Sequence, residues 1–263
     1  GFGLQPDRPL VLLLQEAFRA GEAVPAEPHD ASHGGHRIVP GRTDVVAVAR
    51  EAGLSLRYAP SMRNGHHRSD RGNAILANVA LEDTHSFLLP HVRQRRVAVT
   101  THLSGVADVV LATAHLDTGG GPRLASPRRD ARNLLRFGAG RLVQADELVH
   151  RLIDPEHGAC VVLGADLNTA LGVRDPVVRA LVTAGFHPAT RVGGWRHTYH
   201  ARVRLLLDHV LYRSPTGRIA RVRVARIDEA MGDRSARVFG SDHHPLFARI
   251  DFNDRANDRH PGG

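Results

Sequence analysis

Short apolar runs alternate with polar loops along the chain, and most of these runs have the length of one β-strand. The runs are rich in Val, Leu and Ile, and several of them end in a carboxylate or an amide. We find no heptad series and no internal repeat. The pattern predicts strands over residues 9–16, 54–60, 72–79, 95–103, 107–117, 159–168, 205–213, 219–227 and 244–252.

Other segments have the apolar spacing of a helix, together with recognisable ends. Residues 43–53 begin with a capping residue and end at a glycine. Residues 175–185 begin with an aspartate cap and an early proline, and they close on a glycine. A longer amphipathic stretch covers residues 126–153, with Pro127 near its first turn. These segments predict helices.

The order of these elements indicates the fold class. Strands outnumber helices, and several strands follow one another without a helix between them, which argues against a simple parallel doubly wound sheet. The pattern favours an α/β (α+β) fold in which sheets of mixed direction pack together with helices outside. We expect a single domain over residues 1–252 and a polar carboxyl-terminal tail over residues 253–263.

Composition narrows the partners and the compartment. The chain has 263 residues, a formal net charge of +8 and no lysine, so its 35 basic residues are all arginine. The positive charge predicts attraction to phosphorylated or polyanionic substrates. The single cysteine, Cys160, excludes an internal disulfide framework and sits in an apolar run, which predicts a core residue. No apolar run approaches the roughly 18–20 residues of a membrane span. We expect a monomer. The cysteine count favours the cytoplasm and does not exclude export.

Polar groups that chemistry can use stand at the ends of several apolar strands. A carboxylate in such a place is costly to bury unless it is paired, solvated at a rim or bound to a metal. Because turns often begin with Asp or Asn, one case alone means little. Several cases in one chain predict a shared polar cleft at one edge of the sheets. The groups are Glu16, His115 with Asp117, Asp166 with Asn168, Asp208 with His209, and the segment SDHHP at residues 241–245.

The motifs that are absent and the side chains that remain limit the reaction that the protein can catalyse. The chain has no GxSxG, CxxC, HExxH or GxxxxGK motif, which removes the common nucleophile, redox, zinc-protease and phosphate-loop signatures. Hard oxygen ligands in small number suit Mg²⁺ or Mn²⁺, which retain waters and contact substrate phosphate. Histidines beside them suit acid–base work. The candidates are the oxygen ligands Glu16, Asp166, Asn168 and Asp242 and the histidines His115 and His243. Together with the charge, they predict metal-assisted hydrolysis of a phosphate ester.

An ordered set of motifs carries a family resemblance. LLLQE, RGNAIL, ATAHLDT, VLGADLNT, LLLDHVL and GSDHHPL follow one another between about residues 9 and 250. In this order and spacing the sequence resembles the endonuclease/exonuclease/phosphatase superfamily, the deoxyribonuclease I-like phosphoesterases. The resemblance implies a four-layer sandwich, in which two mixed β-sheets pack face to face with helices on the outside.

The resemblance also implies a role for each motif residue. Glu16 is expected to be the principal Mg²⁺ ligand, and Asp242 to sit beside the metal. Asp166 and Asn168 are expected to position the attacking water or a second metal, and to hold the phosphate.

The histidines of these motifs are expected to divide the remaining work. His243 is expected to act as the general base or electrostatic partner at the phosphate, oriented by Asp208, because a carboxylate that accepts the second N–H of a histidine fixes its tautomer. His115 is expected on the opposite side, where it stabilises developing charge or serves the leaving group. His209 follows Asp208 on a strand and points to the other face, so we expect a structural role. Alternation likewise turns His244 away from the site.

One departure from the family pattern concerns the amino-terminal part. The family's first strand normally carries an Asn that completes the metal site, and a helix follows it. Only fifteen residues precede Glu16, and they contain no Asn. We expect the amino-terminal strand to be missing from this chain; the alternative is that Asn73 substitutes for the absent Asn.

Some further residues are secondary candidates for contacts with substrate. The arginine- and histidine-rich loop over residues 61–73 leads into the RGNAIL motif, which favours Arg71 and Asn73 as contacts to phosphate; a solvated loop is the alternative for the rest of it. The histidines of residues 29–36 favour a solvated loop over a metal site. Trp195 with Tyr199 is equally compatible with a wall of the site and with core packing.

The sequence therefore predicts a Mg²⁺- or Mn²⁺-dependent phosphoesterase that hydrolyses a phosphodiester or phosphomonoester with activated water. The positive charge favours a nuclease, and a lipid or small-molecule phosphodiester is the alternative substrate. A different class of function, a catalytically weak member that binds nucleic acid or a partner protein, is the second hypothesis.

Overall fold

The structure is a computed structural model of the whole chain, and it describes residues 8–20, 43–64, 69–118, 130–153, 158–169, 171–189, 197–200, 204–228 and 241–253. The chain divides into two compact units, Gly1–Asp117 and Thr118–Gly263. Each unit has its own sheet elements and at least one helix, so we describe each by itself.

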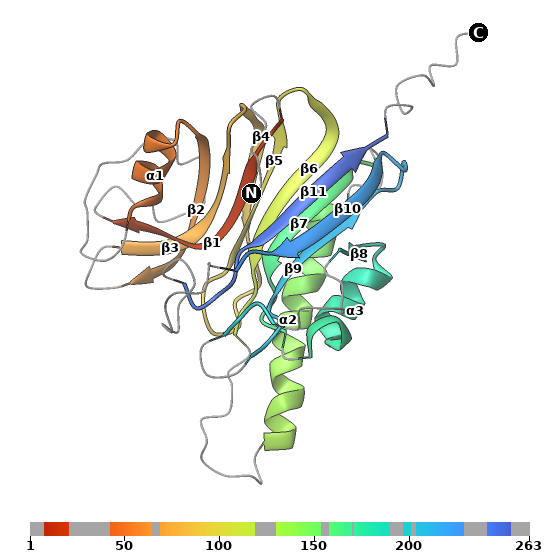
Figure 1. Cartoon of the computed structure of the whole chain (residues 1–263). Coiled ribbons are helices and arrows are strands. Elements are labelled where there is room, and N and C mark those ends of the chain that lie inside the picture. The colour runs from red at the N-terminus through yellow and green to blue at the C-terminus, as the bar shows by residue number, and fades with distance from the viewer. Residues whose placement is uncertain are drawn as a thin grey trace. The chain divides into compact units, whose positions relative to one another are not determined.

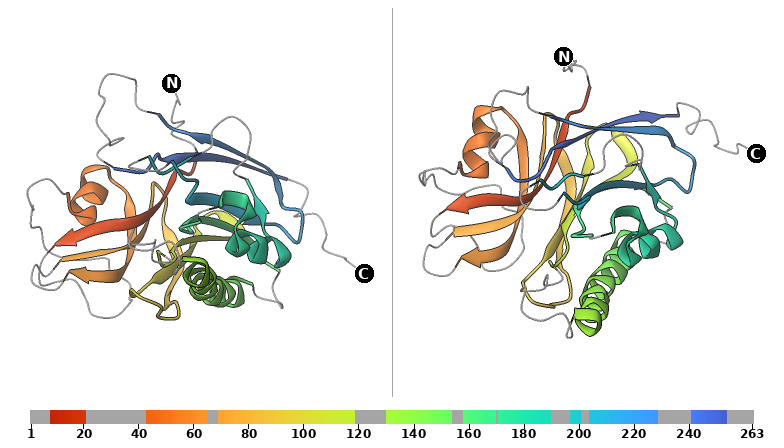
Figure 2. Two further views of the ribbon diagram at one scale, coloured as in Figure 1. Left: turned by 90° about the horizontal axis from the view of Figure 1, so that it is seen from below. Right: turned by 60° about the horizontal axis from the view of Figure 1, so that its bottom comes forward.

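The first unit contains a three-stranded antiparallel sheet with β3 in its centre, in the order β1-β3-β2. The strands are β1 (Val11–Ala20), β2 (Ser55–Asn64) and β3 (Ser69–Ala77), and α1 (Val45–Glu51) packs against them (Figure 1, Figure 2). The helix buries Val45, Val46 and Ala49 against apolar side chains of the sheet. Asp44 fixes this helix to β1, because its carboxylate accepts from the backbone N–H groups of Val46, at 2.8 Å, and Ala20, at 2.9 Å.

Three further strands of the first unit pair consecutively as antiparallel neighbours: β4 (Leu81–Leu88), β5 (Val97–Leu103) and β6 (Val106–His115). β5 is almost wholly buried, which agrees with its apolar sequence. β4 is not among the predicted strands. Its sequence, LEDTHSFL, is mostly polar, and most of its side chains are exposed or half-buried, so the period-2 signal of a half-buried strand is weak.

In the second unit, β7 (Cys160–Asp166) pairs antiparallel with β9 (Asp208–Arg213), which also pairs with the short β8 (His187–Pro188). A separate two-stranded ribbon joins β10 (Ile219–Arg226) to β11 (Leu246–Phe252). The helices α2 (Asp130–Leu152) and α3 (Pro176–Thr183) lie side by side, with a short 3₁₀ turn at Gly172–Arg174 before α3 (Figure 1, Figure 2). Asp175 caps α3 through the N–H of Val177, as the sequence predicts.

The predicted elements are confirmed, and their ends lie within four residues of the predicted ones. Cys160 is fully buried in β7, as expected for a core residue. The predicted beginning of the long helix, residues 126–129, lies outside the described residues, as do residues 254–263 of the predicted tail. Among the helices that the structure describes, none is both long and apolar enough to cross a membrane.

Gly72 explains why the RGNAIL motif carries a glycine within a central strand. A Cβ atom at this position would lie 2.1 Å from the carbonyl oxygen of Ala59 and 2.6 Å from the ring of Tyr58. Since the first of these contacts is backbone in the neighbouring strand, a rotamer change does not relieve it. The glycine therefore permits the close approach of β2 to β3 between the positions of Arg71 and Asn73.

We expect Gly72→Ala to lower the free energy of unfolding by about 3 kcal/mol, at the upper end of what overpacking costs. Gly105→Ala is the matched control, because Gly105 has a φ of 78° and a Cβ there meets no atom within 4 Å. It should cost about 1 kcal/mol, from left-handed backbone strain alone. Urea unfolding of both variants measures the difference, and equal losses would contradict the steric explanation.

Candidate active site

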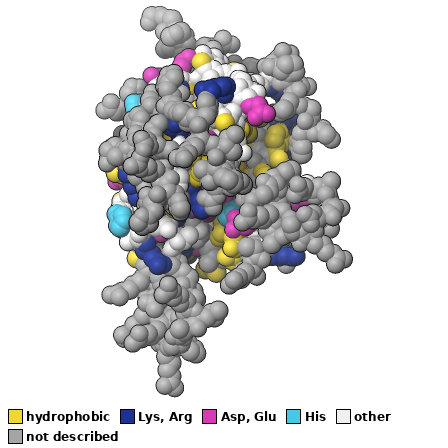
Figure 3. Space-filling model, turned by 90° about the vertical axis from the view of Figure 1, so that its left-hand side faces the viewer, with side chains coloured by type: hydrophobic (Ala, Val, Ile, Leu, Met, Phe, Trp, Pro, Cys, Tyr) yellow, Lys and Arg dark blue, Asp and Glu magenta, His cyan; other side chains and the backbone are white. Residues whose placement is uncertain are grey.

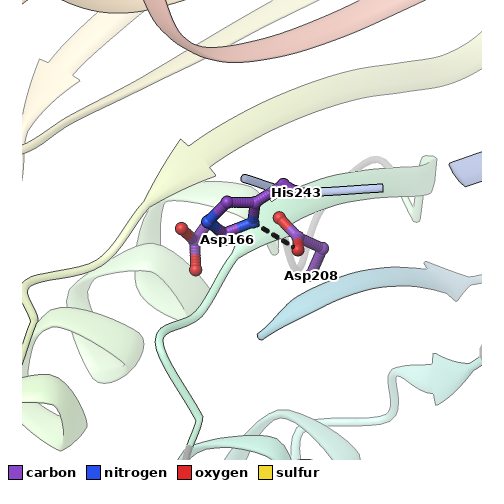
Figure 4. Close-up of side chains that lie close together, drawn as sticks. All are labelled: Asp166, Asp208 and His243. Atoms are coloured by element: carbon purple, nitrogen blue, oxygen red, sulfur yellow. Dashed lines mark hydrogen bonds and ion pairs between the residues drawn. The ribbon is translucent and has the colours of Figure 1, made fainter. Parts of the chain in front are cut away.

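Two aspartates and a histidine of the second unit lie together. Asp166 is the last residue of β7 and Asp208 is the first residue of β9, and the antiparallel register places them directly opposite each other. His243 comes from the segment just before β11. Each of the three side chains offers a ligand atom within 4.8 Å of the others. Figure 4 shows the imidazole of His243 between the two carboxylates.

The hydrogen bond between His243 and Asp208 sets the state of the imidazole. Nδ1 of His243 lies 2.7 Å from Oδ2 of Asp208, and the other ring nitrogen is on the side of Asp166 (Figure 4). Burial lowers the pKa of His243, but the hydrogen bond and charge of Asp208 outweigh it. With the charges of Asp166 and Asp242, they raise the pKa to about 9. The ring therefore carries a positive charge at neutral pH and balances part of the carboxylate charge.

His243 and His244 are adjacent in the chain but have different neighbours. His243 forms a short antiparallel β-bridge with Tyr199. The rings of Tyr199 and His243 meet edge to face at 5.1 Å. His244 instead lies near His197 and His200, with ring centroids 5.5 and 4.6 Å away. Asp228 Oδ1 lies 3.0 Å from His244 Nδ1, an ion-pair distance without hydrogen-bond geometry. The two histidines of the SDHHP segment thus have separate partners.

Thr198 holds the beginning of β9 in place, and sequence reasoning does not single it out. Its buried hydroxyl accepts from the backbone N–H groups of Leu207, at 3.1 Å, and Asp208, at 3.0 Å. Its carbonyl accepts from the N–H of His244 at 2.7 Å. One residue therefore links the backbone of Asp208 to that of the SDHHP segment. A lone threonine outside any motif gives no sequence signal for this role.

The loop after β7 is held in an unusual conformation at Asn168, whose φ is 51°. Oδ1 of Asp166 accepts from the N–H of Asn168 at 2.9 Å, and the carbonyl of Asn168 accepts from the guanidinium of Arg141 in α2. Arg141 is buried and also lies 3.4 Å from the carboxylate of Asp175, the cap of α3. Arg141 was likewise not predicted, because a helix arginine has many possible partners.

His209 has the structural role that its position on β9 predicts. Only 1% of its surface is exposed, and its Nε2 lies 2.8 Å from the hydroxyl of Thr169. Because that hydroxyl donates to the carbonyl of Leu206, the ring nitrogen donates to the hydroxyl. Burial lowers the pKa of His209 to about 4, so the ring is neutral at neutral pH.

The first unit holds Glu16, Arg71, Asn73 and His115. Glu16 lies at a β-bulge of β1 between Leu14 and Ala17, with a φ of 51°, and its half-exposed carboxylate pairs with Nη1 of Arg71 at 3.0 Å. Asn73 is buried and its side chain donates to the carbonyl of Val97 at 2.7 Å, which makes it a brace between strands. His115 is 4% exposed at the end of β6.

Among the sequence candidates, the structure brings Asp166, Asn168, Asp208 and His243 together in the second unit, next to Asp242. The side chain of Asp242 is exposed, and its carbonyl accepts from the N–H of His200 at 3.1 Å. The shared cleft that would join these residues to Glu16 and His115 stays a prediction. Residues 29–36, 65–68 and 119–129 and Trp195 lie outside the described residues.

We expect the metal-free protein to show two histidines with opposite titrations. Asp208 raises the pKa of His243 to about 9, so its stabilising contribution is complete below the ordinary value of 6.5 and is lost as the pH rises through 9. His209 behaves in the opposite way: the native state loses stability as the pH falls from 6.5 toward 4.

Ring resonances in a nuclear magnetic resonance titration measure both values. Asp208→Asn removes the carboxylate charge and should return the pKa of His243 toward 6.5, whereas His209 should keep its low value. A pKa of His243 that is unchanged in Asp208→Asn would contradict the assignment of the shift to Asp208.

Solved structures of similar fold come from several organisms. The 3′–5′ exonuclease NExo from Neisseria meningitidis has a TM-score of 0.53 at 20% identity, with 78% of this chain and 82% of that chain covered. The human Nocturnin catalytic domain with a bound sulfate anion gives 0.56 at 15% identity, covering 79% and 75%. A mannosyl-6-phosphatase from Bacteroides thetaiotaomicron gives 0.50 at 14% identity, covering 75% and 77%. These likenesses confirm the α/β sandwich fold with mixed sheets.

No curated protein matches the chain in sequence. The family model described as Endonuclease/Exonuclease/phosphatase family matches residues 4–243. Members of this family generally depend on a divalent metal ion, and the trio of Asp166, Asp208 and His243 is a group that could bind one. The chain belongs to the endonuclease/exonuclease/phosphatase family, whose members are hydrolases that act on phosphate esters.

Proposed function

We propose that the protein hydrolyses a phosphodiester with an activated water molecule and a bound Mg²⁺ or Mn²⁺ ion. The observation that carries this proposal is the imidazole of His243 between the carboxylates of Asp166 and Asp208. The arrangement concentrates charged groups at the ends of two buried strands, where removing them from water costs free energy. Such a cost is explained better by a catalytic role than by a contribution to stability.

In this mechanism Asp208 orients His243, and His243 acts on the phosphate. The carboxylate of Asp208 holds the proton on Nδ1, which leaves the other ring nitrogen to face the substrate. In the metal-free protein the raised pKa makes the ring cationic at neutral pH, which favours His243 as the electrostatic partner of the phosphoryl oxygens over the role of general base.

Asp166 is the group proposed to receive the proton of the attacking water. The water oxygen forms a bond to phosphorus in line with the ester oxygen that leaves. As the bond from phosphorus to that oxygen breaks, the leaving oxygen takes a proton from solvent water, and Asp166 returns its proton to the solvent. The backbone N–H of Asn168 donates to the carboxylate of Asp166, and we propose that the side chain of Asn168 contributes to holding the phosphate.

The residues present fit a hard divalent cation. Two of the three donors in the trio are carboxylates, and Nδ1 of the third is already engaged by Asp208, so oxygen ligands dominate. Asp166 would hold the ion, with Glu16 as the principal ligand and Asp242 beside it by family resemblance. When bound, such an ion polarises the phosphoryl oxygens and makes a bound water more acidic.

For the substrate class we propose a nucleic acid. The formal charge of +8 and the exonuclease among the similar folds favour a nucleic acid, and Arg71 beside Glu16 offers a guanidinium for its phosphates. On the face shown in Figure 3, described arginine side chains are dispersed among carboxylates rather than gathered in one patch. The mannosyl-6-phosphatase fold keeps a small phosphate ester as the alternative substrate.

The first test compares His243→Ala with His244→Ala on plasmid DNA and bis-p-nitrophenyl phosphate, with Mg²⁺, Mn²⁺ or EDTA. Removal of the cationic ring at the phosphate should reduce kcat by roughly 10²–10³-fold. The kcat of His244→Ala should stay within a few fold of the wild-type value, because the His244 ring lies near His197 and His200. EDTA should abolish the wild-type activity.

Equal activity of the two variants would contradict the role of His243. Absence of any metal-dependent hydrolysis by wild type, together with salt-dependent binding of DNA, would instead favour the binding module.

A further inference from the structure

One partner of His115 in the first unit is an arginine. Nη1 of Arg96 lies 3.0 Å from Nδ1 of His115, and both residues are buried, with 1% and 4% of their surfaces exposed. Arg96 stands directly before β5, and His115 ends β6, which pairs with β5. The contact therefore joins the ends of two neighbouring strands.

A guanidinium has only N–H donors and keeps its charge at any pH that a folded protein tolerates. Nδ1 of His115 must therefore present its lone pair to Arg96. A neutral imidazole carries one N–H, so its proton lies on Nε2. If Nδ1 also carried a proton, its N–H would point at an N–H of the Arg96 guanidinium, which is always charged. This is the reverse of His243, whose Nδ1 carries a proton because it faces the carboxylate of Asp208.

The surroundings hold Arg96 in the position that this contact requires. The carbonyl of Arg96 accepts from the N–H of Leu89 at 2.9 Å, and Met62 Sδ lies 3.4 Å from Nη1. Asp117, two residues beyond His115, is fully buried and accepts from the backbone N–H groups of Arg93, at 2.7 Å, and Gln94, at 3.0 Å. The Asp117 carboxylate thus connects the segment just before Arg96 to the segment just after His115.

We propose that Arg96 is a positioning residue that fixes His115 as the Nε2–H tautomer, so that His115 acts on the substrate as a neutral hydrogen-bond donor. The catalytic part of this inference rests on the proposed function. A donor with a fixed N–H stabilises charge that develops on an oxygen without transferring its proton. His243 and His115 then have different proposed tasks: His243 supplies a positive charge, and His115 supplies a directed N–H.

The tautomer is measured directly on the ring nitrogens of the whole metal-free protein. Long-range ¹H–¹⁵N spectra, with His115→Gln for assignment, should show Nδ1 of His115 unprotonated and Nε2 protonated. Arg96→Met removes the N–H groups at similar length and should give a mixture of the two tautomers, whereas Arg96→Lys should keep the Nε2–H form. Arg93→Met is the matched control, because its exposed side chain is not part of the contact and its backbone N–H is retained.

A protonated Nδ1 in wild type would overturn the proposal, and this measurement requires no variant to fold. An unchanged tautomer in a folded Arg96→Met protein would overturn the role of Arg96.

Kinetics tests the catalytic part. Arg96→Met should lower kcat by roughly 10–100-fold with little change in KM, as for other residues that orient a functional histidine. His115→Gln places an amide N–H near the Nε2 position and should retain more activity than His115→Asn or His115→Ala. An unchanged kcat in Arg96→Met, or equal activities of the three His115 variants, would overturn the donor role. Failure of the proposed function itself would be visible separately, as wild-type protein without metal-dependent hydrolysis.

Discussion

The hydrogen bond between the Asp208 carboxylate and the His243 imidazole is the interaction on which the candidate site depends. The two residues are 35 positions apart, yet their atoms lie 2.7 Å apart. Antiparallel pairing of β7 with β9 places Asp166 opposite Asp208, and Thr198 fixes the backbone on both sides of the contact. Because both carboxylates are largely shielded from water, a cationic ring between them lowers the cost of keeping them charged.

The surroundings of each histidine, which include both its burial and its partner, determine its chemical state. His243 faces a carboxylate and is cationic, His209 faces a hydroxyl in the core and is neutral, and His115 faces a guanidinium that accepts no proton. The same side chain is therefore cationic at His243 and neutral at His209, and we propose a third state, the Nε2–H tautomer, for His115. Composition alone, with 18 histidines, gives no indication of this division.

Much of the fold could be predicted from the sequence, because apolar runs of strand length mark buried strands such as β5 and β7. β4 could not, since its polar and exposed residues resemble a loop. At the site, the motif order singled out Asp166, Asp208 and His243, which the structure places together, and their catalytic roles stay a prediction. The alternation of side chains along β9 correctly predicted that His209 is buried.

The sequence could not indicate the residues that hold the site residues in place. Arg141 contacts Asn168 through a backbone carbonyl, and Thr198 contacts Asp208 through a backbone N–H, so neither depends on a side-chain pattern. The partner of His115 was also hidden, because Arg96 is one of 35 arginines and its contact requires the register of β5 with β6. The single domain over residues 1–252 and the monomeric state stay predictions.

A double-mutant cycle on kcat/KM tests most directly the claim that Asp208 acts through His243. The variants are Asp208→Ala, His243→Ala and the two combined, assayed with Mg²⁺ on one phosphodiester. In the proposed mechanism Asp208 acts only by orienting and charging the ring, so the double variant should lose about as much activity as His243→Ala alone. Losses that multiply as independent factors would contradict the account.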